Sequence, residues 1–122
     1  MYIGDFEKGS VIRRYFNTLS QSQIPATPSI NPTVVVYKDS TTESIAGVTQ
    51  PSVDYDGKAG FHLLVIDTSD AFYDISKDYA VQFTAGTVDG VDLTRSVLFT
   101  FSIQNRSLER VKRDTATIPA LL

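Results

Sequence analysis

Three segments between residues 61 and 103 alternate large apolar residues with other residues at every second position. A period of two places the apolar residues on one face of a β-strand, so residues 61–67, 78–85 and 96–103 are predicted strands. We expect the three to follow one another as a meander that forms one wall of the core. The residues expected to face that core are Phe61, Leu63 and Val65, then Tyr79, Val81, Phe83 and Ala85, then Val97, Phe99, Phe101 and Ile103.

Four shorter segments carry weaker strand signals, either alternation or a high content of β-branched residues. They are residues 11–19, 33–38, 43–49 and 53–55. The last is expected to pair with the first strand of the meander through a turn at Asp56-Gly57, a dipeptide typical of tight turns. The segment 68–77 is expected to cross between strands with a short capped helical turn. Together these segments predict an all-β, antiparallel sandwich of about seven strands.

The segments outside this pattern are expected to extend from the sandwich. Residues 20–32 contain three prolines and no periodicity, and a connection this long in a compact domain is often functional or bound to a partner. The sequence therefore predicts one β-sandwich domain over residues 1–107, with 20–32 as a proline-rich connection, an extended N-terminal segment and a docking tail over residues 108–122. The residues expected to dock the tail are Arg110, Val111, Arg113, Ile118, Leu121 and Leu122.

Composition narrows the possible classes of partner. A length of 122 residues suits one domain, and the absence of cysteine excludes disulfides and thiolate metal sites. The net charge of −3 argues against nucleic acid as the main partner, because nucleic-acid-binding domains favour a basic face. The N-terminal residues lack an apolar run of signal-peptide length, and no apolar window is long enough for a membrane span. We therefore expect synthesis in a cytosol and no membrane partner.

No motif in the chain predicts catalysis, a cofactor or a metal. His62 is the single histidine, and it is expected to lie on the surface or between the sheets, since no Gly-x-Ser-x-Gly motif marks a nucleophile for it. Asp54-Tyr-Asp-Gly57 resembles the start of a calcium loop, but the fifth and twelfth positions hold Lys58 and Val65 instead of oxygen ligands. A looser calcium site between loops and a hydrolase with two converging acids stay open as minor alternatives.

Four tyrosines offer another kind of site. If two of them share an exposed face, they could stack on a sugar ring, although aromatic residues in an all-β chain are more often part of the core. They are Tyr37, Tyr55, Tyr73 and Tyr79. Tyr79 also stands two residues before the inward Val81, at the start of a strand that follows a crossover, which is the position of a tyrosine corner.

A series of short phrases in a fixed order resembles a known family. The phrases are Val36-Tyr-Lys-Asp-Ser-Thr-Thr-Glu-Ser-Ile-Ala-Gly-Val48, Val53-Asp-Tyr-Asp-Gly57, Gly60-Phe-His-Leu-Leu-Val-Ile-Asp-Thr68, Asp70-Ala-Phe-Tyr73, Asp78-Tyr-Ala-Val81, Ala85-Gly-Thr-Val-Asp-Gly-Val91 and Phe101-Ser-Ile-Gln-Asn-Arg-Ser107. Over residues 33–107 the chain is similar to small tailed-bacteriophage virion proteins that carry an immunoglobulin-like domain, of the kind found in fibres and upper baseplate proteins.

The resemblance implies an immunoglobulin-like sandwich and a structural role in a phage particle. The expected protein is non-enzymatic, is present in several copies in the head, neck or tail, and docks on other virion subunits through its terminal arms. It would be assembled in the cytoplasm of the bacterial host and reside in the virion. The alternative is a carbohydrate-binding or host-adhesion module displayed on the virion, built on the tyrosines.

Overall fold

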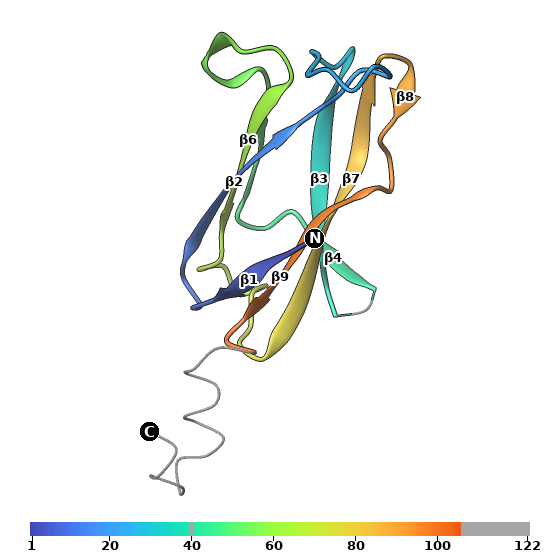
Figure 1. Ribbon diagram of the computed structural model, residues 1–122. Coiled ribbons are helices and arrows are strands. Elements are labelled where there is room, and N and C mark those ends of the chain that lie inside the picture. Colours follow the sequence, from blue (N-terminus) through green and yellow to red (C-terminus); the bar gives the residue numbers. More distant parts are fainter. Residues whose placement is uncertain (40, 106–122) are drawn as a thin grey trace, which may run out of the picture.

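The computed structural model describes residues 1–39 and 41–105, which form two β-sheets packed face to face (Figure 1). The described part of the chain contains nine strands and one short 3-10 helix. They are β1 (Tyr2–Phe6), β2 (Val11–Asn17), β3 (Ile30–Lys38), β4 (Thr42–Ser44), β5 (Val48–Ser52), η1 (Tyr55–Gly57), β6 (Phe61–Asp67), β7 (Lys77–Val88), β8 (Val91–Asp92) and β9 (Val97–Ile103). The predicted all-β sandwich is therefore confirmed.

The strands divide unequally between the two sheets. Sheet A has the order β1-β9-β7-β3-β4, with β8 paired to β7, and sheet B has the order β2-β6-β5. Every pair is antiparallel except β1 and β9, which are parallel. The chain passes between the sheets several times, because β1, β3 and β4 belong to sheet A while β2, β5 and β6 belong to sheet B.

The core lies between the sheets and takes residues from both. Sheet A contributes the alternate residues of β3, β7 and β9, and sheet B contributes those of β2 and β6. Buried members of this core are Ile12, Val34, Val36, Leu64, Ile66, Tyr73, Tyr79, Val81, Phe83, Phe99, Phe101 and Ile103. The inward faces predicted for the strands at 78–85 and 96–103 are correct except at two positions. Val97 is exposed, and Ala85 is only partly buried because the alternation in β7 shifts after Phe83, where Gly86 and Val88 are the buried residues.

The predicted three-stranded meander is wrong in one respect. β7 and β9 are neighbours in sheet A, but β6 lies in the opposite sheet, between β2 and β5. The predicted inward face of β6 is also wrong, because Leu64 and Ile66 enter the core and Phe61 and Val65 lie on the outside. The reason is that β6 is apolar at both alternating sets of positions, so its sequence does not decide which set faces the core.

Several boundaries differ from the prediction. The return strand predicted at 43–49 is two strands, since β4 pairs with β3 and the chain then crosses to sheet B as β5. The partner of β6 is thus β5 and not residues 53–55. The segment 68–77 forms turns without a helix. Tyr73 in this segment is fully buried and closes the end of the core, whereas Ile75 is exposed.

The N-terminal segment is not an extended arm. It forms β1, which pairs with β9 at the edge of sheet A, and the Met1 carbonyl accepts a 2.8 Å hydrogen bond from the Thr100 backbone N–H. The Phe6 ring packs edge-on against Phe101, with ring centroids 6.2 Å apart. The segment is therefore an edge strand of its own sheet, and its contact with a neighbouring subunit stays a prediction.

The proline-rich connection packs on its own domain. An isolated bridge joins Leu19 and Pro25, the Ala26 N–H donates to the Thr18 carbonyl at 2.9 Å, and its last three residues already belong to β3. The sandwich thus accounts for the N-terminal segment and for the connection. The predicted docking residues, and the tail at 108–122 to which they belong, lie outside the described residues.

Candidate functional site

The outer face of sheet A carries a slot between two tyrosines. The register of the sheet places Tyr2, Thr100, Ala80 and Tyr37 in one row across β1, β9, β7 and β3. Ala80 and Thr100 are small, so they form a low floor between the two large rings. The resulting cavity of about 450 Å³ falls within the size range of small-ligand pockets.

Polar groups line both ends of this slot. Asp39 and Asp78 stand at the end nearest the β3–β4 turn, and Gln82 stands at the other end beside the exposed Val97. The Asp78 carboxylate accepts a 3.0 Å hydrogen bond from the side-chain amide of Asn105. The slot can therefore offer aromatic faces, carboxylates and an amide to one ligand.

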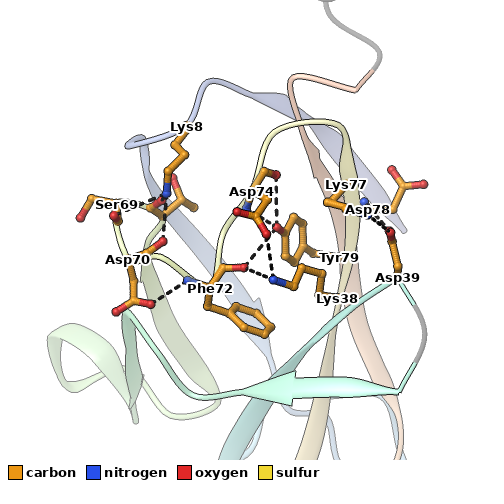
Figure 2. Close-up of polar contacts among 11 residues, drawn as sticks. Lys8, Lys38, Asp39, Ser69, Asp70, Phe72, Asp74, Lys77, Asp78 and Tyr79 are labelled. Carbon is orange, nitrogen blue, oxygen red and sulfur yellow. Dashed lines mark hydrogen bonds and ion pairs between the residues drawn. The ribbon is translucent and has the colours of Figure 1, made fainter.

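The electrostatic balance at the slot is negative. Asp39 forms an exposed ion pair with Lys77 at 3.3 Å (Figure 2). Glu43 lies directly across from Tyr37 in the neighbouring strand. A hydrogen bond from the Tyr37 hydroxyl to Glu43 raises the pKa of the phenol above its ordinary value. Among the described residues, three carboxylates thus stand at or next to the slot against one ammonium group, which favours a cationic ligand.

The outer face of sheet B is the second unusual surface. We call it the sheet B face and define it by Val11 and Tyr15 of β2 and by Phe61, Leu63 and Val65 of β6. The exposed Arg13 lies between Val11 and Tyr15, directly across from Val65. Val11 is 54% and Tyr15 49% exposed. Both faces of β6 are apolar, a pattern typical of strands that are covered on both sides. Within the described residues, sheet A covers one side of β6, and the sheet B face is the other.

An aromatic cluster of Tyr15, Tyr55 and Phe61 stands at one end of the sheet B face. The ring centroids of Tyr15 and Phe61 are 5.2 Å apart with nearly parallel planes, and Tyr55 lies about 6 Å from each of them. These three residues and Asp56 line a shallow cavity of about 520 Å³. The cluster exposes aromatic carbon beside a carboxylate, which is the chemistry that a sugar ring can contact.

The tyrosines named from the sequence do not form one platform. Tyr73 and Tyr79 are buried in the core. Tyr37 lies on the outside of sheet A and Tyr55 packs against sheet B, so the two exposed members belong to opposite sides of the sandwich. The aromatic residues that do cluster with Tyr55 are Tyr15 and Phe61. Alternation in 11–19 could have indicated Tyr15, but only the pairing of β2 with β6 brings the rings together.

His62 lies between the sheets, as one of the two predicted alternatives stated, and its side chain is fully buried. The Asp54 backbone N–H donates to Nδ1 at 3.0 Å, so the proton of the neutral ring is on Nε2. Nε2 is 2.7 Å from the Thr18 hydroxyl, which itself donates to the Ala26 carbonyl at 2.6 Å. Burial lowers the pKa of His62 below its ordinary value. The ring therefore links two loops, the β2–β3 connection and the β5–β6 connection, as a neutral group.

Asp54 has a structural role in the same network. Its carboxylate accepts hydrogen bonds from the Thr27 hydroxyl at 2.6 Å and from the Gly60 N–H at 2.8 Å, and these bonds lower its pKa. The resemblance of residues 54–57 to a calcium loop is thus explained by a turn that Asp54 closes. Among residues 1–39 and 41–105, no three histidine, cysteine or acidic side chains gather as a metal site.

Tyr79 makes the hydrogen bonds expected of a tyrosine corner. Its hydroxyl accepts a 2.6 Å bond from the Asp74 backbone N–H and lies 3.2 Å from the Asp74 carbonyl, five residues upstream (Figure 2). Lys38 closes the same turn, donating to the Phe72 carbonyl at 2.7 Å and pairing with the Asp74 carboxylate at 3.0 Å. Burial raises the pKa of Tyr79 to about 12. This end of the sandwich is therefore held by interactions within the domain.

Comparison of the chain with protein-family models, with curated proteins and with solved structures gives no match. Of the helices in the described part of the chain, none is long and apolar enough to span a membrane. The function proposed below therefore rests on the slot, on the sheet B face and on the sequence resemblance over residues 33–107.

Proposed function

We propose that this chain is a non-enzymatic structural protein of a tailed bacteriophage particle. It is present in several copies in the head, neck or tail, docks on neighbouring virion subunits, and assembles in the cytoplasm of the bacterial host. The observation that carries the proposal is the sheet B face. Strand β6 is apolar on its outer side as well as its inner side, and Val11 and Tyr15 beside it on β2 are exposed. A neighbouring subunit would bury the remaining apolar area.

We further infer that the sandwich is immunoglobulin-like. Two observations support the inference. The division of strands into β2-β6-β5 and β1-β9-β7-β3-β4 corresponds to the two sheets of that fold, with β7 and β9 as its last two strands. Tyr79 stands at the start of β7 and bonds to the backbone upstream, as the tyrosine corner does in that fold. An experimental structure with a different strand order would contradict the inference.

Incorporation into particles tests the structural role. The tagged protein is supplied during particle assembly, and purified particles are analysed by quantitative mass spectrometry. Val65→Lys adds a second positive charge beside Arg13 in the centre of the sheet B face and should reduce incorporation at least about tenfold, which corresponds to roughly 1.4 kcal/mol of lost contact energy. The matched control is Thr84→Lys, on the exposed outer side of sheet A, which should incorporate normally.

Two outcomes contradict parts of the proposal. Absence of the wild-type protein from particles would overturn the structural role. Normal incorporation of Val65→Lys would show that the sheet B face is not the contact. Deletion of residues 115–122 tests the tail separately, because unchanged incorporation of that variant would remove the tail from the docking mechanism.

A carbohydrate-binding module on the virion is the second candidate, and the aromatic cluster favours it. Tyr15, Tyr55 and Phe61 expose ring surface next to Asp56, in a cavity open enough for a saccharide unit. A glycan array followed by titration calorimetry tests this function. Tyr15→Ala and Tyr55→Ala should each weaken binding of any hit by at least about tenfold, and Tyr37→Ala should not. An array without hits would remove this candidate.

A further inference from the structure

We propose that the slot on sheet A receives basic residues from segment 106–122 of a neighbouring copy and so links copies head to tail. The inference deepens the proposed assembly function and rests on it. It names a receiving surface that is separate from the sheet B face. Three features of the protein support it: the shape of the slot, its charge, and the direction in which β9 runs past the slot.

The shape of the slot suits a long, narrow side chain. Tyr2 and Tyr37 stand on either side of a floor made by Ala80 and Thr100, because these four residues occupy one cross-strand row. An arginine or lysine side chain lying on this floor would place its methylene groups between two aromatic rings. Its charged end would then reach the carboxylate end of the slot. Aromatic faces attract such cations as well as their aliphatic stems.

The charges of the slot and of the segment are complementary. Asp39 and Asp78 line one end of the slot, and Glu43 pairs across from Tyr37. Segment 106–122 contains four basic residues and two acidic ones, while the rest of the chain carries a net charge of −5. The basic residues are Arg106, Arg110, Lys112 and Arg113. The segment is therefore the part of this chain that an acidic, aromatic slot would bind.

The chain direction favours a neighbouring copy as the source of the segment. Strand β9 passes the slot at Val97 and Thr100 and ends at Ile103, beyond the pairing of Ser102 with Asp78. Asn105 follows at the Asp78 end, so the chain leaves the sheet after passing the slot. The side-chain amide of Asn105 already donates to the Asp78 carboxylate, so entry into its own slot would require the chain to turn back at once over the outer face of sheet A. Seventeen residues span up to roughly 55–60 Å when extended, which is enough to reach another copy.

The proposed contact joins two different surfaces of identical copies, and this determines how the assembly can grow. A single head-to-tail contact of this kind leaves one slot and one segment unused in the dimer, so it continues into a ring or a filament, whereas reciprocal exchange of the segments would close at two copies. The proposed contact therefore predicts that association does not stop at two copies.

The experiment uses full-length variants that each lose one half of the contact. Ala80→Arg fills the floor of the slot and adds a positive charge next to Asp39 and Asp78. A second variant reverses the charge of the segment with Arg110→Glu, Lys112→Glu and Arg113→Glu. Thr84→Arg is the matched control for the first, since it adds the same side chain to the outer side of the same strand. Light scattering over a range of concentrations measures the mass, and circular dichroism checks the fold.

The expected result is a pattern of complementation. The wild type and Thr84→Arg should associate with rising concentration, and each of the other two variants alone should lose at least tenfold in association constant. A mixture of these two variants should form dimers and stop there, because one supplies an intact segment and the other an intact slot. High salt should weaken all of this association.

Three outcomes would overturn the inference. They are a mixture that stays monomeric while the wild type associates, equal association of Ala80→Arg and Thr84→Arg, and a wild-type protein that is monomeric at every concentration. None of these three outcomes bears on incorporation into particles through the sheet B face, which the Val65→Lys variant tests. A failure of this inference is thus distinguishable from a failure of the proposed function.

Discussion

His62 lies between the sheets with both ring nitrogens bonded to uncharged groups. Nδ1 accepts the Asp54 N–H, so a second ring proton would have no acceptor and would face a donor. Burial lowers the pKa of His62, and the charge of Asp54 offsets this in part. The unfolded chain consequently binds a proton at a higher pH than the native protein does. The free energy of unfolding should therefore fall as the pH drops below the ordinary histidine pKa of about 6.5.

Urea unfolding between pH 5 and pH 8 measures this effect. The free energy of unfolding should be constant above about pH 7 and should decrease below it, with a slope of at most about 1.4 kcal/mol per pH unit from this one group. His62→Gln removes the titrating ring and should flatten the dependence between pH 5 and 6.5, although it lowers stability. Carboxylates such as Asp54, whose pKa is lowered, titrate further toward acid and do not contribute in this window. An unchanged slope in His62→Gln would refute the assignment.

The effect of the Tyr79 hydroxyl on the free energy of unfolding can be predicted for that single atom. Removing its hydroxyl leaves the Asp74 backbone N–H without its 2.6 Å acceptor at the end of the core. Tyr79→Phe should therefore lower the free energy of unfolding by about 1–3 kcal/mol. Tyr37→Phe is the matched control, because its hydroxyl bonds to Glu43 on the outside of sheet A and should cost less than about 1 kcal/mol. Equal losses in denaturant unfolding would contradict the role of Tyr79.

At the scale of elements, the proline-rich connection and the loop before β6 depend on a close backbone approach at Gly60. Gly60 has a φ of +75°, and a Cβ there would lie 2.7 Å from the Pro25 carbonyl carbon. Gly57 has a similar φ of +69° but open space around it. Both residues adopt the left-handed region, but only at Gly60 would a side chain also collide with a neighbouring backbone.

Alanine at these two glycines should separate the two requirements. Gly57→Ala should cost about 1 kcal/mol, the usual penalty of a left-handed alanine. Gly60→Ala should cost at least about 2 kcal/mol more, because the connection at Pro25 and Ala26 must move away from the loop. Thermal unfolding of both variants measures the difference. A Gly60→Ala protein as stable as Gly57→Ala would show that the connection does not pack as described.

At the scale of the whole molecule, β1 completes the sandwich as an edge strand of sheet A. The Phe6 ring packs on Phe101, and the Phe6 backbone carbonyl accepts a 2.9 Å hydrogen bond from the Gln104 N–H. Phe6→Ala should therefore lower the free energy of unfolding of the isolated protein by about 2 kcal/mol, somewhat less than for a fully buried phenylalanine. Glu7→Ala, one residue further on, should leave it unchanged within about 0.5 kcal/mol. If Phe6→Ala were neutral in urea unfolding, β1 would not be part of the folded domain.

The sequence by itself located most of the strands and much of their inward pattern, but it missed β1 and placed a strand at 53–55, where the chain turns. Alternation is a local property, so it located β7 and β9 and predicted that Tyr79, Val81 and Phe101 face the core. The corner role of Tyr79 was also predictable, because it depends on a position within one strand. The turn predicted at Asp56-Gly57 is present as η1, because turn residues are also a local signal.

Only the tertiary structure decided how the strands combine. β6 is apolar on both faces, so nothing local could assign it to sheet B or choose Leu64 over Leu63 for the core. The pairing of β1 with β9 joins residues about a hundred positions apart, and no local pattern reports such a contact. The slot and the aromatic cluster have the same origin, since Tyr2 meets Tyr37 across the slot, and Tyr15 meets Phe61, only through strand register. Register follows from burial and pairing of the whole chain, which is why the candidate surfaces appear only in the folded protein.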